Sequence, residues 1–148
     1  MEVQQDFKDL LALFNVHKVK YLIVGGYALA FHGVPRFTGD IDIFIKPDRA
    51  NAGRILKALS EFGFGSLNLA VEDFCLPEKV VQLGVPPVRI DLITSLTGVS
   101  WKEASGAGVP GTYGGVPVCF IGRHELVANK RATGRKKDLA DLEALGEE

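Results

Sequence analysis

The chain has 148 residues, of which 47% are hydrophobic and 24% are charged. This length fits one domain over residues 1–148, and the composition excludes a fibrous or disordered protein. Seventeen Lys and Arg residues against 18 Asp and Glu residues give a net charge of −1, so we expect no broad basic face for nucleic acid or for an anionic membrane. We also expect no membrane-spanning helix and no secretory signal, because no uncharged apolar stretch approaches the roughly 18 residues that a span needs.

The two cysteines, Cys75 and Cys119, stand apart in the sequence. No Cys-x-x-Cys pair or other metal-ligand spacing surrounds them, which argues against a structural zinc site. Isolated cysteines of this kind fit small side chains in the core and a reducing compartment. The sequence therefore predicts a cytoplasmic location.

Helices and strands alternate along the first half of the chain. Hydrophobic residues recur there at helical spacing or in short β-branched runs. Gly25 and Gly26 separate a strand from a short helix, and Asp48 is a typical N-cap residue. The predicted elements are a helix over 3–16, a strand over 21–24, a helix over 27–32, a strand over 41–45 and a helix from 48 to about 62.

The second half of the chain is less regular. Two of its strands surround a turn rich in Gly and Pro, and residues 94–115, rich in Gly, Ser and Thr, are expected to be irregular. Residues 64–78 give no clear pattern. The predicted elements are strands over 80–83, 88–93 and 116–121 and helices over 123–133 and 136–145.

Two aspartates, Asp40 and Asp42, lie at the start of the second strand. Side chains at positions i and i+2 of a strand point to the same face, with Cα atoms about 6.5–7 Å apart, so both carboxylates can bind the same ion. In the preceding turn, Gly25 and Gly26 leave backbone N–H groups accessible to phosphate oxygens. The alternative is a plain glycine turn followed by acids at an exposed strand edge.

A third carboxylate, Asp91, lies in the apolar strand over 88–93. An unpaired acid buried there would cost several kcal/mol, so we expect a compensating partner. A divalent cation shared with Asp40 and Asp42 is one candidate, because magnesium prefers carboxylate and phosphate oxygens. A salt bridge to Arg89 or a solvated edge position is the alternative.

The combined pattern resembles the signature of the nucleotidyltransferase superfamily, which has the polymerase-beta-like fold. The residues that carry this resemblance are Val24-Gly25-Gly26, Asp40-Ile41-Asp42 and the later Asp91. One departure is that the superfamily often has Gly-Ser where this chain has Gly25-Gly26, so a hydroxyl near the phosphates is missing. Further similarity, to small bacterial nucleotidyltransferases of the AbiEii toxin type, lies in the segment 28–33, in Arg36 and Thr38, in Lys130-Arg131 and in the segment 134–142.

This resemblance implies an α/β (α+β) nucleotidyltransferase fold, with a mixed β-sheet flanked by α-helices and short C-terminal helices. It also implies that Asp40, Asp42 and Asp91 are the catalytic residues and hold Mg²⁺ (or Mn²⁺). The nucleotide-binding residues that it implies are Gly25, Gly26, Arg36, Thr38, Lys130 and Arg131.

The basic cluster between Lys130 and Lys137 extends this set. Arg135, Lys136 and Lys137 are further candidates for phosphate contacts, since Arg can bind a phosphate through two nitrogens. A solvated helix end beside the neighbouring aspartates explains the cluster as well.

The resemblance implies a magnesium-dependent transferase that moves a nucleoside monophosphate from a nucleoside triphosphate to a hydroxyl of an unknown acceptor. That acceptor is a tRNA, a protein or a small molecule, and its identity depends on residues 94–115 and on surfaces that the sequence does not define. The alternative is a non-catalytic nucleotide-binding or toxin–antitoxin partner module with the same fold. Because a short chain has little room for an acceptor domain, a homodimer or a partner protein that completes the cleft is compatible with the sequence.

Overall fold

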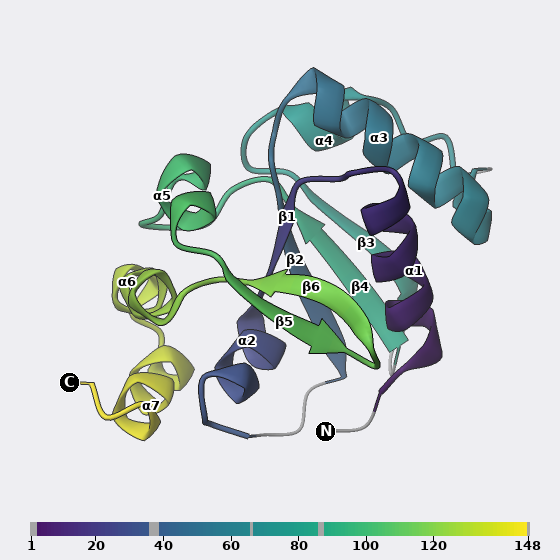
Figure 1. Cartoon of the computed structure of the whole chain (residues 1–148). Coiled ribbons are helices and arrows are strands. Elements are labelled where there is room, and N and C mark those ends of the chain that lie inside the picture. The colour runs from purple at the N-terminus through teal and green to yellow at the C-terminus, as the bar shows by residue number, and fades with distance from the viewer. Residues whose placement is uncertain (1–2, 36–38, 66, 86–87, 148) are drawn as a thin grey trace.

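The computed structural model of the chain describes residues 3–35, 39–65, 67–85 and 88–147 (Figure 1). Within them, six strands form one sheet in the order β3-β4-β2-β1-β6-β5. The strands are β1 Tyr21–Val24, β2 Asp40–Ile45, β3 Val80–Val85, β4 Val88–Ile93, β5 Val109–Tyr113 and β6 Val116–Phe120. The helices are α1 Gln5–Val16, α2 Gly25–Phe31, α3 Arg49–Leu59, α4 Glu72–Cys75, α5 Trp101–Gly106, α6 Arg123–Thr133 and α7 Lys136–Ala144, and a π-helical turn, Ser60–Phe64, follows α3.

The centre of the sheet mixes parallel and antiparallel pairing. β2 pairs antiparallel with β1 and parallel with β4, and β1 pairs parallel with β6. Two antiparallel pairs, β3-β4 and β5-β6, complete the two ends of the sheet. The predicted mixed sheet flanked by helices is therefore confirmed.

Alternation along β2 separates a core face from a polar face. Ile41, Ile43 and Ile45 are at most 1% exposed, and they belong to the same core as Phe7 and Phe14 of α1. Figure 1 shows α1 and α3 on one side of the sheet and α6 and α7 on the other. The aspartates of β2 alternate with these isoleucines, so they face the opposite side of the sheet, which they share with the buried Phe44.

Local signals set the ends of two helices. Asp48 caps α3, since its Oδ1 accepts a hydrogen bond from the backbone nitrogen of Asn51 at 2.7 Å. α3 ends at Leu59, slightly before the predicted end, because the chain continues into the π-helical turn that contains Gly63 at φ +107°. α2 begins at Gly25, two residues earlier than predicted, so the glycines lie in its first turn.

The expectation of an irregular segment over residues 94–115 is wrong, because the segment contains α5 and β5. A capping box starts α5: the Ser100 hydroxyl accepts from the backbone nitrogen of Glu103 at 3.1 Å, and the Glu103 carboxylate accepts from that of Ser100 at 3.0 Å. β5 lies at the edge of the sheet, where its proline is tolerated. Gly114 and Gly115, both at positive φ, form the tight turn into β6.

Two expectations from composition concern the cysteines and the membrane. Cys75 and Cys119 are both free thiols and both half-buried. None of the described helices is long and apolar enough to cross a membrane. The cytoplasmic location stays a prediction.

Candidate active site

The charged residues of β2 and β4 meet where these two strands pair. Their parallel register places Asp40 opposite Arg89 and Asp42 opposite Asp91. Because neighbouring strands lie about 4.8 Å apart and residues in register share a face, all four side chains gather on one patch of the sheet. We call Asp40, Asp42, Arg89 and Asp91 the sheet cluster.

The guanidinium of Arg89 joins two of the three carboxylates. Its Nη2 donates to Oδ2 of Asp40 at 2.7 Å and to Oδ2 of Asp91 at 3.1 Å, and its Nε donates to Oδ1 of Asp91 at 3.0 Å. Asp91 is 8% exposed, and these bonds supply the partner that a buried acid requires. The salt bridge to Arg89, which the sequence left as the alternative for Asp91, is therefore present.

The third carboxylate of the sheet cluster, Asp42, has a raised pKa. Burial, together with the neighbouring carboxyls of Asp91 and Asp40, raises the pKa of Asp42 to about 6, against an opposing effect of Lys137. A raised carboxyl pKa means that the site disfavours further negative charge. A cation brought close to Asp42 would relieve this repulsion.

Gly25 allows Asp42 to occupy its position. A Cβ atom built on Gly25 would lie 2.2 Å from Oδ2 of Asp42, well inside contact distance, and the residue has φ +66°. Both observations require glycine, since a side chain would strain the backbone and collide with the carboxylate. The first glycine of the Gly-Gly pair thus has a definite role: it gives room to an acid of the site.

The sheet cluster borders a cavity of about 910 Å³. Asp40, Asp42, Gly25 and Gly26 form part of its wall, and residues of α6 and α7 form another part. Asp91 does not line the cavity. The volume lies within the range of about 300–1,000 Å³ that is typical of small-molecule sites.

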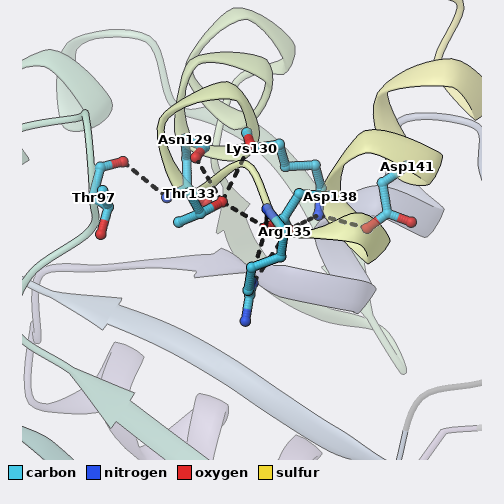
Figure 2. A network of polar contacts seen from close by, with 7 residues as sticks. All are labelled: Thr97, Asn129, Lys130, Thr133, Arg135, Asp138 and Asp141. Atoms are coloured by element: carbon cyan, nitrogen blue, oxygen red, sulfur yellow. Dashed lines mark hydrogen bonds and ion pairs between the residues drawn. The ribbon is translucent and has the colours of Figure 1, made fainter.

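Figure 2 shows a second group of charges, where α6 meets α7. We call Lys130, Arg135, Asp138 and Asp141, all of which line the cavity, the helix cluster. Lys130 is 6% exposed, and its ammonium donates to Oδ2 of Asp141 at 2.8 Å and lies 3.8 Å from Oδ1 of Asp138. Lys130, predicted to bind nucleotide, thus borders the cavity while its charge is held by two aspartates.

Asp138 is the most strongly bonded member of the helix cluster. Its Oδ2 accepts from the Thr133 hydroxyl at 2.7 Å, from the backbone nitrogen of Arg135 at 3.1 Å and from Nε of Arg135 at 2.7 Å. These bonds to the charged form hold the pKa of the Asp138 carboxyl well below its usual range. The carboxylate therefore fastens the start of α7 to the end of α6.

The remaining predicted nucleotide-binding residues fall into two groups. Arg131 is half exposed, donates to Oε1 of Glu147 at 3.2 Å and is not part of the cavity wall. Arg36 and Thr38 lie outside the described residues. Lys137, which the sequence offered as a further phosphate candidate, lines the cavity and acts on the pKa of Asp42.

The part of the wall that follows β4 belongs to the segment 94–115, which the sequence connected with the acceptor without naming single residues. Ser95, Leu96 and Thr97 line the cavity, and Nδ2 of Asn129 on α6 donates to the carbonyl of Thr97 at 2.9 Å. This contact joins the segment to α6 (Figure 2). A Ser/Thr-rich segment carries no periodic signal for such a role, since its position depends on a partner 32 residues away.

The donor chemistry of the sheet cluster fits a divalent cation. Three carboxylates supply the oxygen ligands that Mg²⁺ and Mn²⁺ prefer. Within the described part of the chain, however, no three acidic, His or Cys side chains are arranged to hold a metal ion. Arg89 gives a physical reason, because its guanidinium bonds to both Asp40 and Asp91. Metal binding at these residues stays a prediction.

Solved structures with a similar fold are nucleotidyltransferases. A protein from Thermotoga maritima assigned as a nucleotidyltransferase aligns over 93% of this chain and 88% of its own, with a TM-score of 0.63 and 14% identity. The chain has the nucleotidyltransferase fold. The antibiotic-resistance factor ANT(2'')-Ia aligns with a TM-score of 0.59 and 15% identity over 95% of this chain and 80% of its own. The lincosamide antibiotic adenylyltransferase LnuA, solved with lincomycin, aligns with a TM-score of 0.56 and 14% identity over 99% of this chain and 98% of its own.

Sequence comparison adds no closer relative to these structures. No protein-family model matches the chain, and no curated protein matches it. The TM-scores of 0.56–0.63 support the nucleotidyltransferase fold, and at identities of 14–15% they show the fold alone. The similarity to the AbiEii toxin type stays a prediction from the sequence.

Proposed function

We propose that this protein transfers a nucleoside monophosphate from a nucleoside triphosphate to a hydroxyl group. One observation carries the proposal: Asp40 and Asp42 share a cavity with Gly25 and Gly26 and with the cationic residues Lys130, Arg135 and Lys137. In a chain with the nucleotidyltransferase fold, this combination offers ligands for a metal ion, a backbone surface for phosphate and positive charge for a triphosphate.

In this proposal, Asp40, Asp42 and Asp91 hold Mg²⁺ or Mn²⁺. The bound metal would polarise the α-phosphorus and stabilise the oxygens of the attacking and leaving groups. Burial and the neighbouring carboxyls of Asp91 and Asp40 raise the pKa of Asp42, which supports the assignment, because a cation placed there stabilises the charged carboxylate. The acceptor hydroxyl would lose its proton to a carboxylate of the site, and pyrophosphate would leave.

Binding of the triphosphate is assigned to groups on both walls of the cavity. Gly25 and Gly26 line the cavity, and we assign the backbone of Gly26 to phosphate oxygens, since the Asp42 carboxylate occupies the space beside the Cα of Gly25. Lys137 brings positive charge to the same cavity, and Lys130 borders it. The roles of Arg36, Thr38 and Arg131 in nucleotide binding rest on the resemblance to the family.

For the acceptor, we infer a small molecule with a hydroxyl group. Four aspartates line the cavity, and the chain has a net charge of −1, which disfavours a polyanion such as tRNA. The similar adenylyltransferase LnuA was solved with lincomycin, and ANT(2'')-Ia was solved with adenylyl-2''-tobramycin. Both ligands are small molecules, which supports the same class here.

A second candidate is a non-catalytic nucleotide-binding module, including a toxin–antitoxin partner of the AbiEii-like kind. The bonds of Arg89 to Asp40 and Asp91 favour it, since a permanent guanidinium neutralises the acids without a metal. Such a module would act through a homodimer or a partner protein. It would bind nucleotide without releasing pyrophosphate.

Thermal unfolding with each of the four nucleoside triphosphates, with and without Mg²⁺ or Mn²⁺, tests binding first. A ligand at about 100 times its dissociation constant adds roughly 2.7 kcal/mol, which for a chain of this size is a rise in Tm of about 5–10 °C. The nucleotide that binds is then supplied with an α-phosphorus label together with pooled small molecules, total tRNA or total protein. We expect label in the small-molecule pool.

Variants separate the two candidates. Asp40→Asn should reduce label transfer by about a thousandfold, equivalent to about 4 kcal/mol of transition-state stabilisation. Asp9→Asn removes one carboxylate from the exposed face of α1 and serves as the control. Nucleotide binding without label in any pool would favour the non-catalytic module, and absence of nucleotide binding would contradict both candidates.

A further inference from the structure

Arg89 lies inside the acidic site rather than beside it. It is paired in register with Asp40, and Asp91 follows two residues later on the same face of β4. Its guanidinium is about one quarter exposed and uses Nε and Nη2 to reach both Asp40 and Asp91. The planar fork of arginine can contact two carboxylates at once, which a lysine ammonium on a flexible stem does less well.

The position of this guanidinium conflicts with a metal ion bound to the same acids. Three of the carboxylate oxygens that could coordinate the ion, Oδ2 of Asp40 and both oxygens of Asp91, accept hydrogen bonds of Arg89. A positive ion would also be repelled by a guanidinium held within a few ångströms of it. Asp40 and Asp91 therefore cannot keep all their hydrogen bonds to Arg89 and coordinate a metal ion at the same time.

We propose that Arg89 is the counter-ion of the metal-free site and that it competes with the divalent metal for Asp40 and Asp91. This inference rests on the proposed function, because it concerns the metal that the transfer requires. Arg89 keeps the three acids compensated while the site lacks metal. Loading with metal then requires Arg89 to withdraw from Asp40, so the protein binds metal more weakly than its three carboxylates alone would.

The test measures metal binding directly, without reference to catalysis. Purified full-length protein is titrated with Mn²⁺, and free Mn²⁺ is counted by electron paramagnetic resonance. Arg89→Gln removes the competing charge and should tighten Mn²⁺ binding by about tenfold to a hundredfold, as expected for one unit charge at a few ångströms. Arg89→Lys keeps the charge but loses the fork, so its affinity should lie between those of the wild type and Arg89→Gln.

Arg49→Gln is the matched control. Arg49 lies at the start of α3 and makes a long ion pair with Glu72, at 3.9 Å between exposed side chains. Its substitution makes the same change in net charge away from the sheet cluster. The Mn²⁺ affinity of Arg49→Gln should equal that of the wild type.

Stability without metal supplies the second readout. In a chelating buffer, Arg89→Gln should unfold at a lower temperature than the wild type, because Asp40 and Asp91 lose their cation. Saturating Mn²⁺ should then raise its Tm by more than it raises the wild-type Tm. If Arg89→Gln does not fold, the comparison of Arg89→Lys with the wild type tests the proposal, both in Mn²⁺ affinity and in Tm.

The outcomes are distinguishable. Equal or weaker Mn²⁺ binding by both Arg89 variants, with clear binding by the wild type, overturns the role of Arg89 and leaves the proposed function intact. Binding by Arg89→Gln but not by the wild type supports the competition in its strongest form. Absence of Mn²⁺ binding by all variants overturns this inference together with the metal dependence of the proposed function.

Discussion

The two charged walls of the cavity differ in how their charges are balanced. In the helix cluster, two cationic and two anionic side chains alternate in direct contact, and the pKa of Asp138 is depressed. In the sheet cluster, one guanidinium bonds to two of three neighbouring carboxylates, and the pKa of the third, Asp42, is raised. The balanced charges of the helix cluster stabilise the fold, whereas the excess negative charge of the sheet cluster favours the binding of a cation.

The largest effect on stability is expected in the balanced cluster. Asp138→Ala should lower the free energy of unfolding by about 3–5 kcal/mol, because it leaves the buried ammonium of Lys130 and the hydroxyl of Thr133 with fewer acceptors. Urea unfolding at pH 7 measures the change. Thr133→Val removes one hydrogen bond from the same carboxylate and should cost about 1 kcal/mol. Equal losses for the two variants would contradict the central role of Asp138.

In the sheet cluster, removing one negative charge should raise the free energy of unfolding instead of lowering it. The pKa of Asp42 is about 6 in the folded chain, above the value of 3.8 for an unperturbed aspartate, so ionisation of Asp42 costs stability. This cost is absent below pH 4, grows as the pH rises toward 6 and is constant above it. In metal-free buffer, Asp42→Asn should therefore stabilise the protein by up to about 3 kcal/mol above pH 6 and change little below pH 4.

Unfolding of wild type and Asp42→Asn across pH 4–8 measures this difference. Asp138→Asn is the comparison variant in the helix cluster. Because the pKa of Asp138 is depressed, its ionised carboxylate stabilises the folded chain at every pH above about 4, so Asp138→Asn should destabilise the protein across this range. Destabilisation by Asp42→Asn at pH 8 would contradict the claim that the ionised carboxylate of Asp42, unlike that of Asp138, lowers the stability of the protein.

A smaller effect is expected where Gly25 meets Asp42. Gly25→Ala should cost about 1–2 kcal/mol for the left-handed backbone and should also displace the Asp42 carboxylate, weakening Mn²⁺ binding by about tenfold. Gly134→Ala is the matched control, since Gly134 has φ +60° and a Cβ built on it would lie 3.7 Å from the carbonyl oxygen of Arg131, an ordinary contact distance. The control should lose stability with no change in metal affinity. Equal Mn²⁺ affinity in both variants would contradict the contact.

The smallest effects distinguish two basic residues near the helix cluster. Lys137→Gln should weaken triphosphate binding by about tenfold, because Lys137 lines the cavity and acts on Asp42. Arg131→Gln should weaken it by less than about twofold, since the exposed Arg131 side chain pairs with Glu147 outside the cavity wall. Isothermal titration compares the two variants. A larger loss for Arg131→Gln would favour the assignment made from the family resemblance.

Local and periodic signals predicted most of the fold. The alternation of Ile41, Ile43 and Ile45 with the two aspartates identified both faces of β2, and Asp48 identified the start of α3. The Ser-x-x-Glu capping box of α5 and the Gly-Gly turn before β6 were equally local signals, although they were hidden within a segment rich in turn residues. Recognising them would have placed α5 and β5.

The site was predictable only in part, because its geometry depends on contacts between distant segments. The spacing of Asp40 and Asp42 follows from the strand period, and Asp91 could be named as an acid that needs a partner. That Arg89 serves both Asp40 and Asp91 depends on the register of β2 against β4. Nothing in the sequence alone indicates that Lys130 lies between two aspartates of α7.

The parallel pairing of β2 with β4 also bears on how the protein folds. Asp40 and Arg89 are 49 residues apart, so closing this contact costs loop entropy before the hydrophobic core can compensate for it. No fragment that ends before β4 can contain the complete set of acids. We therefore expect metal affinity to appear in a refolding experiment only once β4 has paired with β2, which makes Mn²⁺ binding an indicator of this pairing.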